Sequence, residues 1–543
     1  MIYLITIFVV LFFILAWRRL DLAVMFLIAA MPTYLIRFSV LGLPATLLEA
    51  MIWAVFLVWA IKNFSRVKNN FLENFKKENR KIKIRYPFDW EIVLLLIVAL
   101  AAASVAGFSS SSLGIFKAYF FEPALFFIVV FNVMNGEKGR EKILWALAAS
   151  ALAVSLLAIY QKITGQLIDN NLWAAADTRR VVSFFGYPNA VGLYLGPIVL
   201  VITGWLFTVI ARCGNPFLSS SGDPALDAGE SPGIQKGETQ INLDSRLRGN
   251  DKREKVARND IIVIIFISLT IILSLLSIYF AKSKGALMGV AAGLVIFGLL
   301  AGKKIRCTTI IALILISAGI AAYQSARDLA VKNITLTNLS GQIRKAGWAD
   351  TWAMLKDGRV LTGAGLANYQ ASVAPYHTEG IFYKDFSDPD AQRKLVFNEA
   401  YRTAHWQPLE IYLYPHNIFL NFWSELGLAG LLLFAWVIIK YFWLGIKILS
   451  LRAAGKSEAI SGRPVREIAK LVLSEAKDPR SPEYGLLAMT DKYLNIGLIC
   501  AMVVIVAHGL VDVPYFKNDL AVMFWLLIAM MSMIKLESVN SPR

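Results

Sequence analysis

The chain has 543 residues, of which 57% are hydrophobic, and its mean hydropathy is +0.57. A soluble globular domain is usually about 45–50% apolar, so the composition excludes an ordinary water-soluble protein. The formal net charge of +17 could indicate binding to nucleic acid. The Lys and Arg residues, however, cluster in short connections between apolar runs, which is how membrane proteins orient themselves, so we expect no nucleic-acid partner.

The apolar runs are long enough to cross a lipid bilayer, which needs about 20 residues of helix. We expect spans near residues 2–17, 21–37, 43–61, 90–107, 113–133, 142–161, 187–211, 260–280, 284–301, 307–323, 416–445, 493–513 and 518–535. The first run has no basic start and no small-residue cleavage site, so we interpret it as a span and not as a signal peptide. The sequence therefore predicts an all-α polytopic membrane protein with about 12–13 transmembrane helices.

Basic residues crowd the connections that follow odd-numbered spans, and the longest of these are 62–85, 212–258 and 447–492. Cytoplasmic loops carry the excess of Lys and Arg, which predicts an N-terminus outside and a C-terminus in the cytoplasm. The long connection 324–415 then lies on the extracytoplasmic face. A connection of this length is usually functional, so we expect the chemistry on that face.

The domain organisation follows from these connections. We predict a transmembrane bundle at 1–323, a large extracytoplasmic loop with an amphipathic helix at 324–415, and further transmembrane helices at 416–543. Two polar cytoplasmic segments, 214–257 and 452–484, have the composition of disordered insertions and resemble peptides encoded by bacterial intergenic repeats. The three cysteines are far apart in the chain, and their spacing suggests no disulfide framework and no metal site.

Histidine is the side chain best suited to proton transfer at neutral pH. The four histidines, His377, His405, His416 and His508, all lie in the outer loop or in spans near it. His416 stands out because the polar loop becomes an apolar span at this point, in "YPHNIFLNFWSELGLAGLLLF". We expect Pro415 in the first helical turn, with His416 and Asn417 at a helix N-terminus that favours an anion.

Three more residues of this span face defined directions on a helical wheel. Gly427 and Gly430 return near the face of His416, where small residues let a neighbouring helix approach. Glu425 falls on roughly the opposite face, where it either pairs with another polar group inside the bundle or takes part in catalysis.

A His-Asn pair followed nine residues later by Gly-x-x-Gly resembles the motif of the O-antigen ligase and polymerase superfamily. Three other stretches, between about residues 179 and 513, resemble the same superfamily. They are "RRVVSFFGYPNAVGLYLG" with Arg180, Pro188 and Asn189, "GQIRKAGWADTWAMLKDGRVLTGAGLANYQ" with Arg344, Trp348, Gly363 and Gly365, and "AHGLVDVPY" with His508 and Asp512. In the second stretch, Arg344, Trp348 and Leu355 share one face of an amphipathic helix that we expect at the membrane interface.

The resemblance implies a glycosyltransferase of GT-C-like architecture in the bacterial inner membrane, with its active site on the periplasmic face. It would move a glycan from a polyprenyl pyrophosphate onto a glycolipid or glycan acceptor, with the lipid bilayer as its third partner. A pyrophosphate leaving group needs cations, and Arg180 and Arg344 would supply them. The acceptor hydroxyl needs a base, which would be His416, although His416 could instead orient the acceptor or bind pyrophosphate. Asn417, Trp348 and Asn189 would bind substrate, and the supporting residues would be Glu425, Gly427, Gly430, His508 and Asp512.

Asp388 and Asp390 form an Asp-x-Asp, with Asp385 nearby, a pattern that holds a divalent ion in many nucleotide-sugar transferases. Pro389 makes the segment look like a turn. Because two arginines can neutralise the leaving group, we expect an inverting, metal-independent reaction without a cofactor.

Four functions compete at this stage. The first is an O-antigen ligase-like enzyme, and the second is a polysaccharide polymerase of the same superfamily. The third is a protein O-oligosaccharyltransferase. A polysaccharide transporter or flippase is the fourth, supported by the ionisable residues Glu49, Lys117 and Glu122 within predicted spans, although the spans show no internal repeat.

Overall fold

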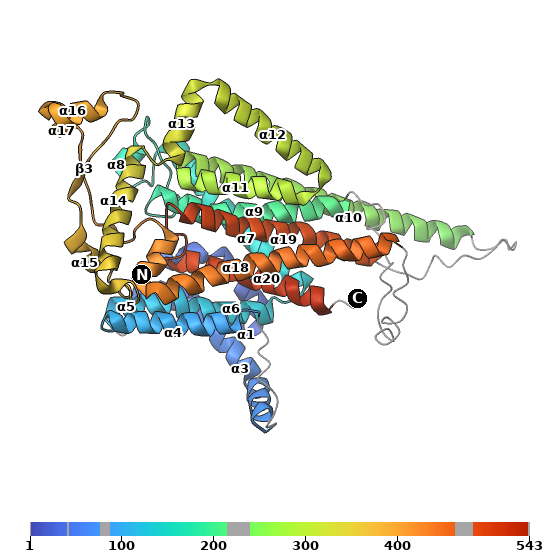
Figure 1. The fold of residues 1–543 in the computed structure, drawn as a ribbon. Coiled ribbons are helices and arrows are strands. Elements are labelled where there is room, and N and C mark those ends of the chain that lie inside the picture. Colours follow the sequence, from blue (N-terminus) through green and yellow to red (C-terminus); the bar gives the residue numbers. More distant parts are fainter. Residues whose placement is uncertain (1, 41–42, 77–86, 214–238, 462–481, 541–543) are drawn as a thin grey trace.

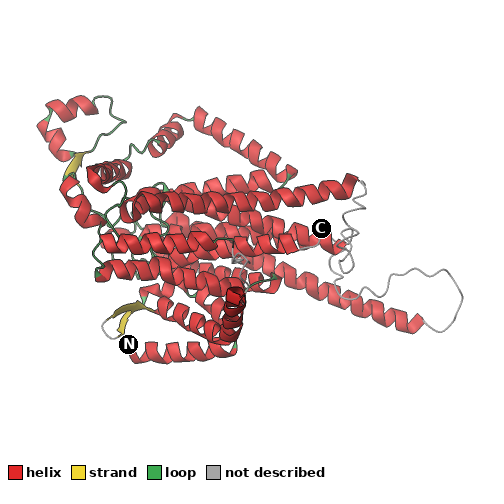
Figure 2. Ribbon diagram, turned by 60° about the horizontal axis from the view of Figure 1, so that its bottom comes forward, coloured by secondary structure: helices red, strands yellow, loops and turns green. Residues whose placement is uncertain are grey.

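The computed structural model describes residues 2–40, 43–76, 87–213, 239–461 and 482–540. Within these ranges, ten helices are long and apolar enough to cross a membrane, and two shorter apolar helices stand at the beginning of the chain. The strands form two short antiparallel hairpins at the periphery (Figure 2). The predicted all-α polytopic architecture is confirmed.

The bundle is built from thirteen stretches of helix that follow the predicted spans in order. They are α1 (Ile2–Arg18), α2 (Leu20–Ala29), α3 (Leu47–Lys76), α4 (Asp89–Val105), α5 (Ser110–Phe116) continuing through a π-helical turn into α6 (Glu122–Val133), α7 (Glu137–Thr164), α9 (Pro188–Cys213), α10 (Thr239–Phe280), α11 (Lys284–Ala301), α12 (Lys303–Ala322), α18 (Ile418–Ser461), α19 (Pro482–Gly509) and α20 (Asn518–Asn540). A short helix, α8 (Asn171–Ala174), lies in the connection between α7 and α9.

The second predicted span, 21–37, is wrong as a continuous helix. Helix α2 ends at Ala29 and a 3₁₀ turn follows at Met31–Leu35. The chain then forms β1 (Arg37–Val40), which pairs with β2 (Leu43–Thr46). Pro32 explains the early end, because proline has no N–H to donate and its ring clashes with the preceding helical turn. Hydropathy alone does not detect this break.

Helices α9, α19 and α20 form the centre of the bundle. In α20, 94% of the membrane window is buried, whereas in α12 the buried share is 0%. Small residues explain the close packing of α9 on α19, because a Cβ placed on Gly204 would lie 3.0 Å from the Cα of Gly497. Helix α12 instead leans away from the other helices and is linked to the bundle mainly through α11 (Figure 1).

The segment between α12 and α18 gathers beyond one end of the bundle (Figure 1). It contains α13 (Gln324–Ile334), α14 (Leu339–Met354), α15 (Tyr369–Val373), the hairpin β3 (Gly380–Phe382) with β4 (Trp406–Pro408), α16 (Ala391–Phe397) and α17 (Glu399–Ala404). At the other end, ion pairs join basic connections, as in Lys142 with Asp21 and Arg212 with Glu137. The positive-inside rule, applied to the sequence, predicts that the segment 324–415 is extracytoplasmic.

The two predicted insertions extend over both described and undescribed residues. Of the segment 214–257, residues 214–238 lie outside the described residues, and helix α10 begins at Thr239. Of the segment 452–484, residues 462–481 lie outside the described residues, while α18 continues to Ser461 and α19 begins at Pro482. The described parts of both segments continue the transmembrane helices, and the expectation of disordered or weakly ordered insertions stays a prediction.

Helix α18 breaks at Gly427, where φ is +74°. A Cβ on Gly427 would lie 2.1 Å from the carbonyl oxygen of Leu361, and one on Gly430 would lie 2.2 Å from the Cβ of Leu426. The N–H of Leu428 donates to the same Leu361 carbonyl over 3.1 Å. The predicted approach of a neighbouring helix is therefore wrong, because both glycines accommodate the break and the loop that packs into it.

Replacing Gly427 with alanine should lower the free energy of unfolding by at least about 2 kcal/mol, since a left-handed backbone and a backbone clash add up. The melting temperature of the purified protein in detergent measures this effect. The matched control is Gly319→Ala in the exposed helix α12, where a Cβ would meet nothing within 4 Å. Equal melting temperatures for both variants would show that the break at Gly427 is not required.

Candidate functional site

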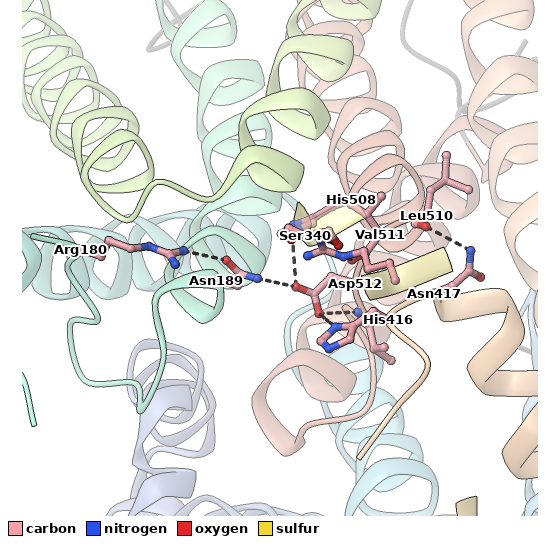
Figure 3. Close-up of polar contacts among 11 residues, drawn as sticks. Arg180, Asn189, Ser340, His416, Asn417, His508, Leu510, Val511 and Asp512 are labelled. Carbon is pink, nitrogen blue, oxygen red and sulfur yellow. Dashed lines mark hydrogen bonds and ion pairs between the residues drawn. The ribbon is translucent and has the colours of Figure 1, made fainter. Parts of the chain in front are cut away.

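A buried carboxylate, Asp512, organises the end of the bundle where the loop 324–415 lies. Asp512 follows α19, and its Oδ1 accepts a hydrogen bond from the N–H of Val513 over 2.9 Å. Its Oδ2 accepts one from the side-chain amide of Asn189 over 3.1 Å. Two imidazoles also face it: His416 Nδ1 lies 3.6 Å from Oδ1, and His508 Nε2 lies 3.9 Å from Oδ2 (Figure 3). One carboxylate thus joins residues from α9, α19 and the start of α18.

The environment of Asp512 keeps this carboxylate charged. Burial by itself raises the pKa of Asp512, but His416, His508 and the N–H of Val513 lower it, and the pKa lies well below the usual value. A charged group with this many partners can hold an imidazole in one orientation and stabilise that imidazole when it gains a proton.

His416 lies just outside α18 and not within it. Its φ is +49°, and the helix begins at Ile418. Asn417 caps the helix, because its Oδ1 accepts a hydrogen bond from the N–H of Leu420 over 3.0 Å. The amide nitrogen of Asn417 donates to the carbonyl of Leu510 over 3.1 Å. The prediction that Pro415 belongs to the first helical turn is therefore wrong, whereas Asn417 does lie at the helix N-terminus, and the turn at His416 directs its ring toward Asp512 (Figure 3).

The position of His416 leaves one ring nitrogen available for chemistry. Nδ1 faces Asp512 at a distance longer than a hydrogen bond, and such contacts often tighten when substrate binds. The side chain is 30% exposed. The ring of Tyr412 packs edge-on against it, with 4.9 Å between ring centroids. Nε2 is thus the atom that can accept a proton from a bound molecule.

Arg344 approaches the same short loop from α14. Its Nε donates to the carbonyl of Val511 over 2.8 Å, and its Nη1 donates to the carbonyl of Ser340 over 3.3 Å. Among the described residues, no hydrogen bond occupies Nη2. The guanidinium is therefore fixed beside Asp512 while retaining donors for an anion.

Arg180 lies on the other side of Asp512. Its Nη2 donates to the side-chain oxygen of Asn189 over 3.3 Å, and its Nε donates to the carbonyl of Ala281 over 3.0 Å (Figure 3). Burial lowers the pKa of Arg180, because the guanidinium loses water there. A bound anion would offset that cost. Arg180 thus connects to the carboxylate through Asn189.

A cleft opens where α14 faces the residues that precede α18. Arg344, His416 and Tyr412 line it, together with Asp350, His377 and Glu410. Arg180, Asn189, Trp348 and Asn417 do not belong to its lining. The structure therefore brings Arg344 and His416 to one surface, and the other four residues predicted for catalysis or substrate binding lie outside this lining.

Glu425 and the glycines after Arg359 fix the loop on the bundle. The buried Glu425 carboxylate accepts a hydrogen bond from the N–H of Ala367 over 2.7 Å. A Cβ on Gly363 would lie 2.6 Å from the carbonyl oxygen of Ser424, and one on Gly365 would lie 2.9 Å from that of Ala102. Glu425 thus binds a backbone group of the outer loop and not a polar side chain within the bundle, and it holds this turn between α18 and α4.

The predicted amphipathic helix is present as α14, but the residues expected at the membrane interface differ in their exposure. Leu355 is fully buried in a small core of the loop, so the prediction that it lies at the lipid interface is wrong. Trp352 is 41% exposed and packs against Trp423, with 5.4 Å between ring centroids. The indole N–H of Trp348 is buried, and no hydrogen bond satisfies it within the described residues. Loop packing therefore uses Leu355, while Trp352 remains at the surface.

The Asp-x-Asp segment forms a turn in the outer loop. Asp388 accepts hydrogen bonds from the N–H of Asp390 over 3.0 Å and from Lys394 Nζ over 2.8 Å. Asp385 accepts one from the N–H of Ser387 over 2.9 Å. These carboxylates stabilise local structure far along the chain from His416.

Sequence reasoning gives Asp512 only a supporting role and misses two parts of the site. These are Tyr412 and the pair formed by Asp350 and His377, whose Oδ2 and Nδ1 lie 3.5 Å apart. His377 had been noted as one of four outer histidines, but nothing in the sequence indicates that it faces Asp350.

These observations first define a class: a polytopic α-helical membrane protein whose His–Asp pair and arginines meet at one end of the bundle. A family model described as O-antigen ligase matches residues 269–435, a range that contains Arg344 and His416. This match supports membership of the chain in the O-antigen ligase superfamily, which its His-Asn and Gly-x-x-Gly motif also indicates. A search of curated proteins finds no match. Arg180, His508 and Asp512 lie outside the matched range.

Proposed function

We propose that this protein is an O-antigen ligase-like glycosyltransferase. It transfers a glycan from a polyprenyl pyrophosphate to a surface lipid or glycan acceptor, at the extracytoplasmic face of the bacterial inner membrane. One observation supports this most directly: the loop that follows α19 holds His416 through Asp512 and Arg344 through Val511. A base and a cation thereby face one cleft.

In this proposal His416 activates the acceptor. Its Nε2 takes the proton of the acceptor hydroxyl while the hydroxyl oxygen attacks the anomeric carbon of the donor sugar. The bond between that carbon and the pyrophosphate oxygen breaks, and the pyrophosphate leaves with the electron pair. Attack opposite the leaving group inverts the anomeric configuration. Asp512 stabilises the imidazolium that forms, as an aspartate does in a Ser-His-Asp triad.

The arginines neutralise the charge that develops on the leaving group. Arg344 is held at Nε and Nη1, so its remaining donors can reach phosphate oxygens without reorganisation. Arg180, fixed by Ala281 and Asn189, adds a second positive charge on the far side of Asp512. With two cations available the proposed reaction needs no metal ion.

The test is glycan transfer by the purified protein in detergent, with a labelled polyprenyl-pyrophosphate donor. Arg344→Ala should lower the rate by about 10²–10³, the usual loss when one charge-stabilising donor is removed. Arg344→Lys should retain part of the activity, because lysine keeps the charge but not the planar fork. The matched control is Arg327→Ala, an exposed arginine of α13, which should keep full activity.

The same assay separates the competing functions. Transfer in detergent needs no sealed compartment, so it contradicts a pure transporter. Deletion of the gene distinguishes the enzymes: loss of a ligase leaves long carrier-linked glycan, whereas loss of a polymerase leaves single repeat units. Transfer to a protein acceptor would instead identify a protein O-oligosaccharyltransferase. A wild-type protein that binds donor but transfers nothing to any acceptor would refute the proposal.

A further inference from the structure

Besides Arg344, the cleft carries a second polar group, Asp350, at its other end. Asp350 is buried, with 6% of its surface exposed. Its Oδ1 accepts a hydrogen bond from the hydroxyl of Thr378 over 2.8 Å, and its Oδ2 accepts one from the N–H of Thr378 over 3.3 Å. His377 Nδ1 lies 3.5 Å from the same Oδ2. Asp350 therefore fastens the segment that follows α15 against α14.

Helix α14 supplies a positive and a negative side chain of the cleft, Arg344 and Asp350. Arg344, Gly347 and Asp350 follow each other at intervals of three residues along α14, and all three line the cleft. Residues three apart in a helix lie on the same face. The positive end of this face meets the loop that bears Asp512, and the negative end meets His377. Helix α14 thus fixes the positions of one positive and one negative group of the cleft.

The negative end is suited to hydroxyl groups. Because His377 Nδ1 faces Asp350, its Nε2 is the ring nitrogen that can serve a ligand. Glu410 is exposed on the same lining, and its carboxylate accepts hydrogen bonds. Tyr412, 41% exposed, adds an aromatic surface between this end and His416. A few fixed polar groups beside an aromatic wall are typical of a small-ligand subsite.

We infer that Asp350, His377 and Glu410 form the subsite for the acceptor sugar, and that this sugar is uncharged. The inference rests on the proposed function and names the substrate class of its second half-site. Sugar hydroxyls donate to the imidazole and to the Glu410 carboxylate, while the donor pyrophosphate is drawn to Arg344. Two carboxylates at this end repel a pyrophosphate and also an acidic acceptor sugar. In this arrangement His377 binds the acceptor, and Asp350 is a positioning residue.

The measurement is steady-state transfer with acceptor and donor varied separately. His377→Ala should raise the KM for a neutral-sugar acceptor by about tenfold, the equivalent of one lost hydrogen bond, with kcat and the donor KM unchanged. His377→Gln should restore part of the affinity, because its amide keeps a polar group there. Asp350→Asn should raise the same KM less. The matched control is His405→Ala, a histidine of the same loop that packs on Tyr401 outside the cleft, which should change nothing.

Specificity gives an independent readout. With a uronic-acid acceptor, Glu410→Gln should raise kcat/KM several-fold over wild type, while kcat/KM for the neutral acceptor stays the same or falls. Wild-type transfer together with an unchanged acceptor KM in His377→Ala would overturn the subsite and leave the proposed function intact. A fall in kcat without a change in KM would also overturn it, since His377 would then act in the chemistry or in folding. Absence of transfer by the wild type would instead refute the proposed function.

Discussion

Replacing His416 with alanine is expected to lower kcat for glycan transfer by about 10²–10⁴, the usual loss when a positioned base is removed. The ring of His416 faces the buried carboxylate of Asp512 and also lines the cleft. Binding of the donor should change little, because Arg344 is held by Val511 and Ser340 and not by the histidine. Single-turnover transfer and donor binding, measured on the same detergent-purified variant, separate these effects.

The control for this variant is His405→Ala, which removes an imidazole from the same outer loop. A parallel loss of donor affinity in His416→Ala would indicate that His416 binds pyrophosphate as a cation. Normal kcat in a correctly folded His416→Ala protein would show that the base lies elsewhere.

Asp512→Asn is expected to lower kcat by a comparable factor, about 10²–10⁴, although the side chain keeps its size. An asparagine offers Asn189 and His416 one oxygen and one amide group, so it cannot accept from both and cannot stabilise an imidazolium. Residues that act as a unit lose activity non-additively. The double variant with His416→Ala should therefore be little slower than the slower single variant, and a fully multiplicative loss would contradict the pair.

Asp512→Asn should also lower the thermal stability, and the pH dependence of that loss follows from the lowered pKa of Asp512. A carboxylate whose pKa is lowered in the folded state contributes its stabilisation above the unfolded pKa and loses it as the pH falls through the folded value. The ordinary pKa of an aspartate is 3.8, so the Asp512 carboxylate, whose pKa is lower, remains charged at any higher pH. The thermal stability that Asp512→Asn removes should thus be constant from about pH 5 to 8. Asp388→Asn, in an exposed turn, serves as the control for removal of one carboxylate.

Much of the fold could be predicted from the sequence because lipid imposes a simple rule. Backbone groups must be satisfied within each segment, so long apolar runs become helices, and α9, α11 and α20 begin within a residue of the prediction. The rule fails where a run is interrupted, as at Pro32, since hydropathy averages over the break. It also fails at Gly427, where only the three-dimensional path of the loop residue Leu361 shows why glycine is required.

The sequence could indicate some residues of the site, but not the carboxylate at its centre. His416 and Arg344 could be named because a motif and a charge near an interface mark them. A motif marks Asp512 only as a supporting residue, and its central role depends on the fold bringing Asn189 and His416 to it over long sequence separations. Asp350 and His377 lie 27 positions apart by their numbering, and their contact depends on how the chain returns after α15.

The segment 324–415 is attached to the bundle along its length and not only at its ends. Arg344 binds Val511, the turn at Gly363 and Gly365 packs on α18 and α4, and the N–H of Ala367 binds Glu425. The segment is therefore fixed to the bundle at several internal positions, and it cannot open as a lid without breaking several of these contacts. The positions of its charged side chains are set when the protein folds, so these side chains need little reorganisation when a reactant binds.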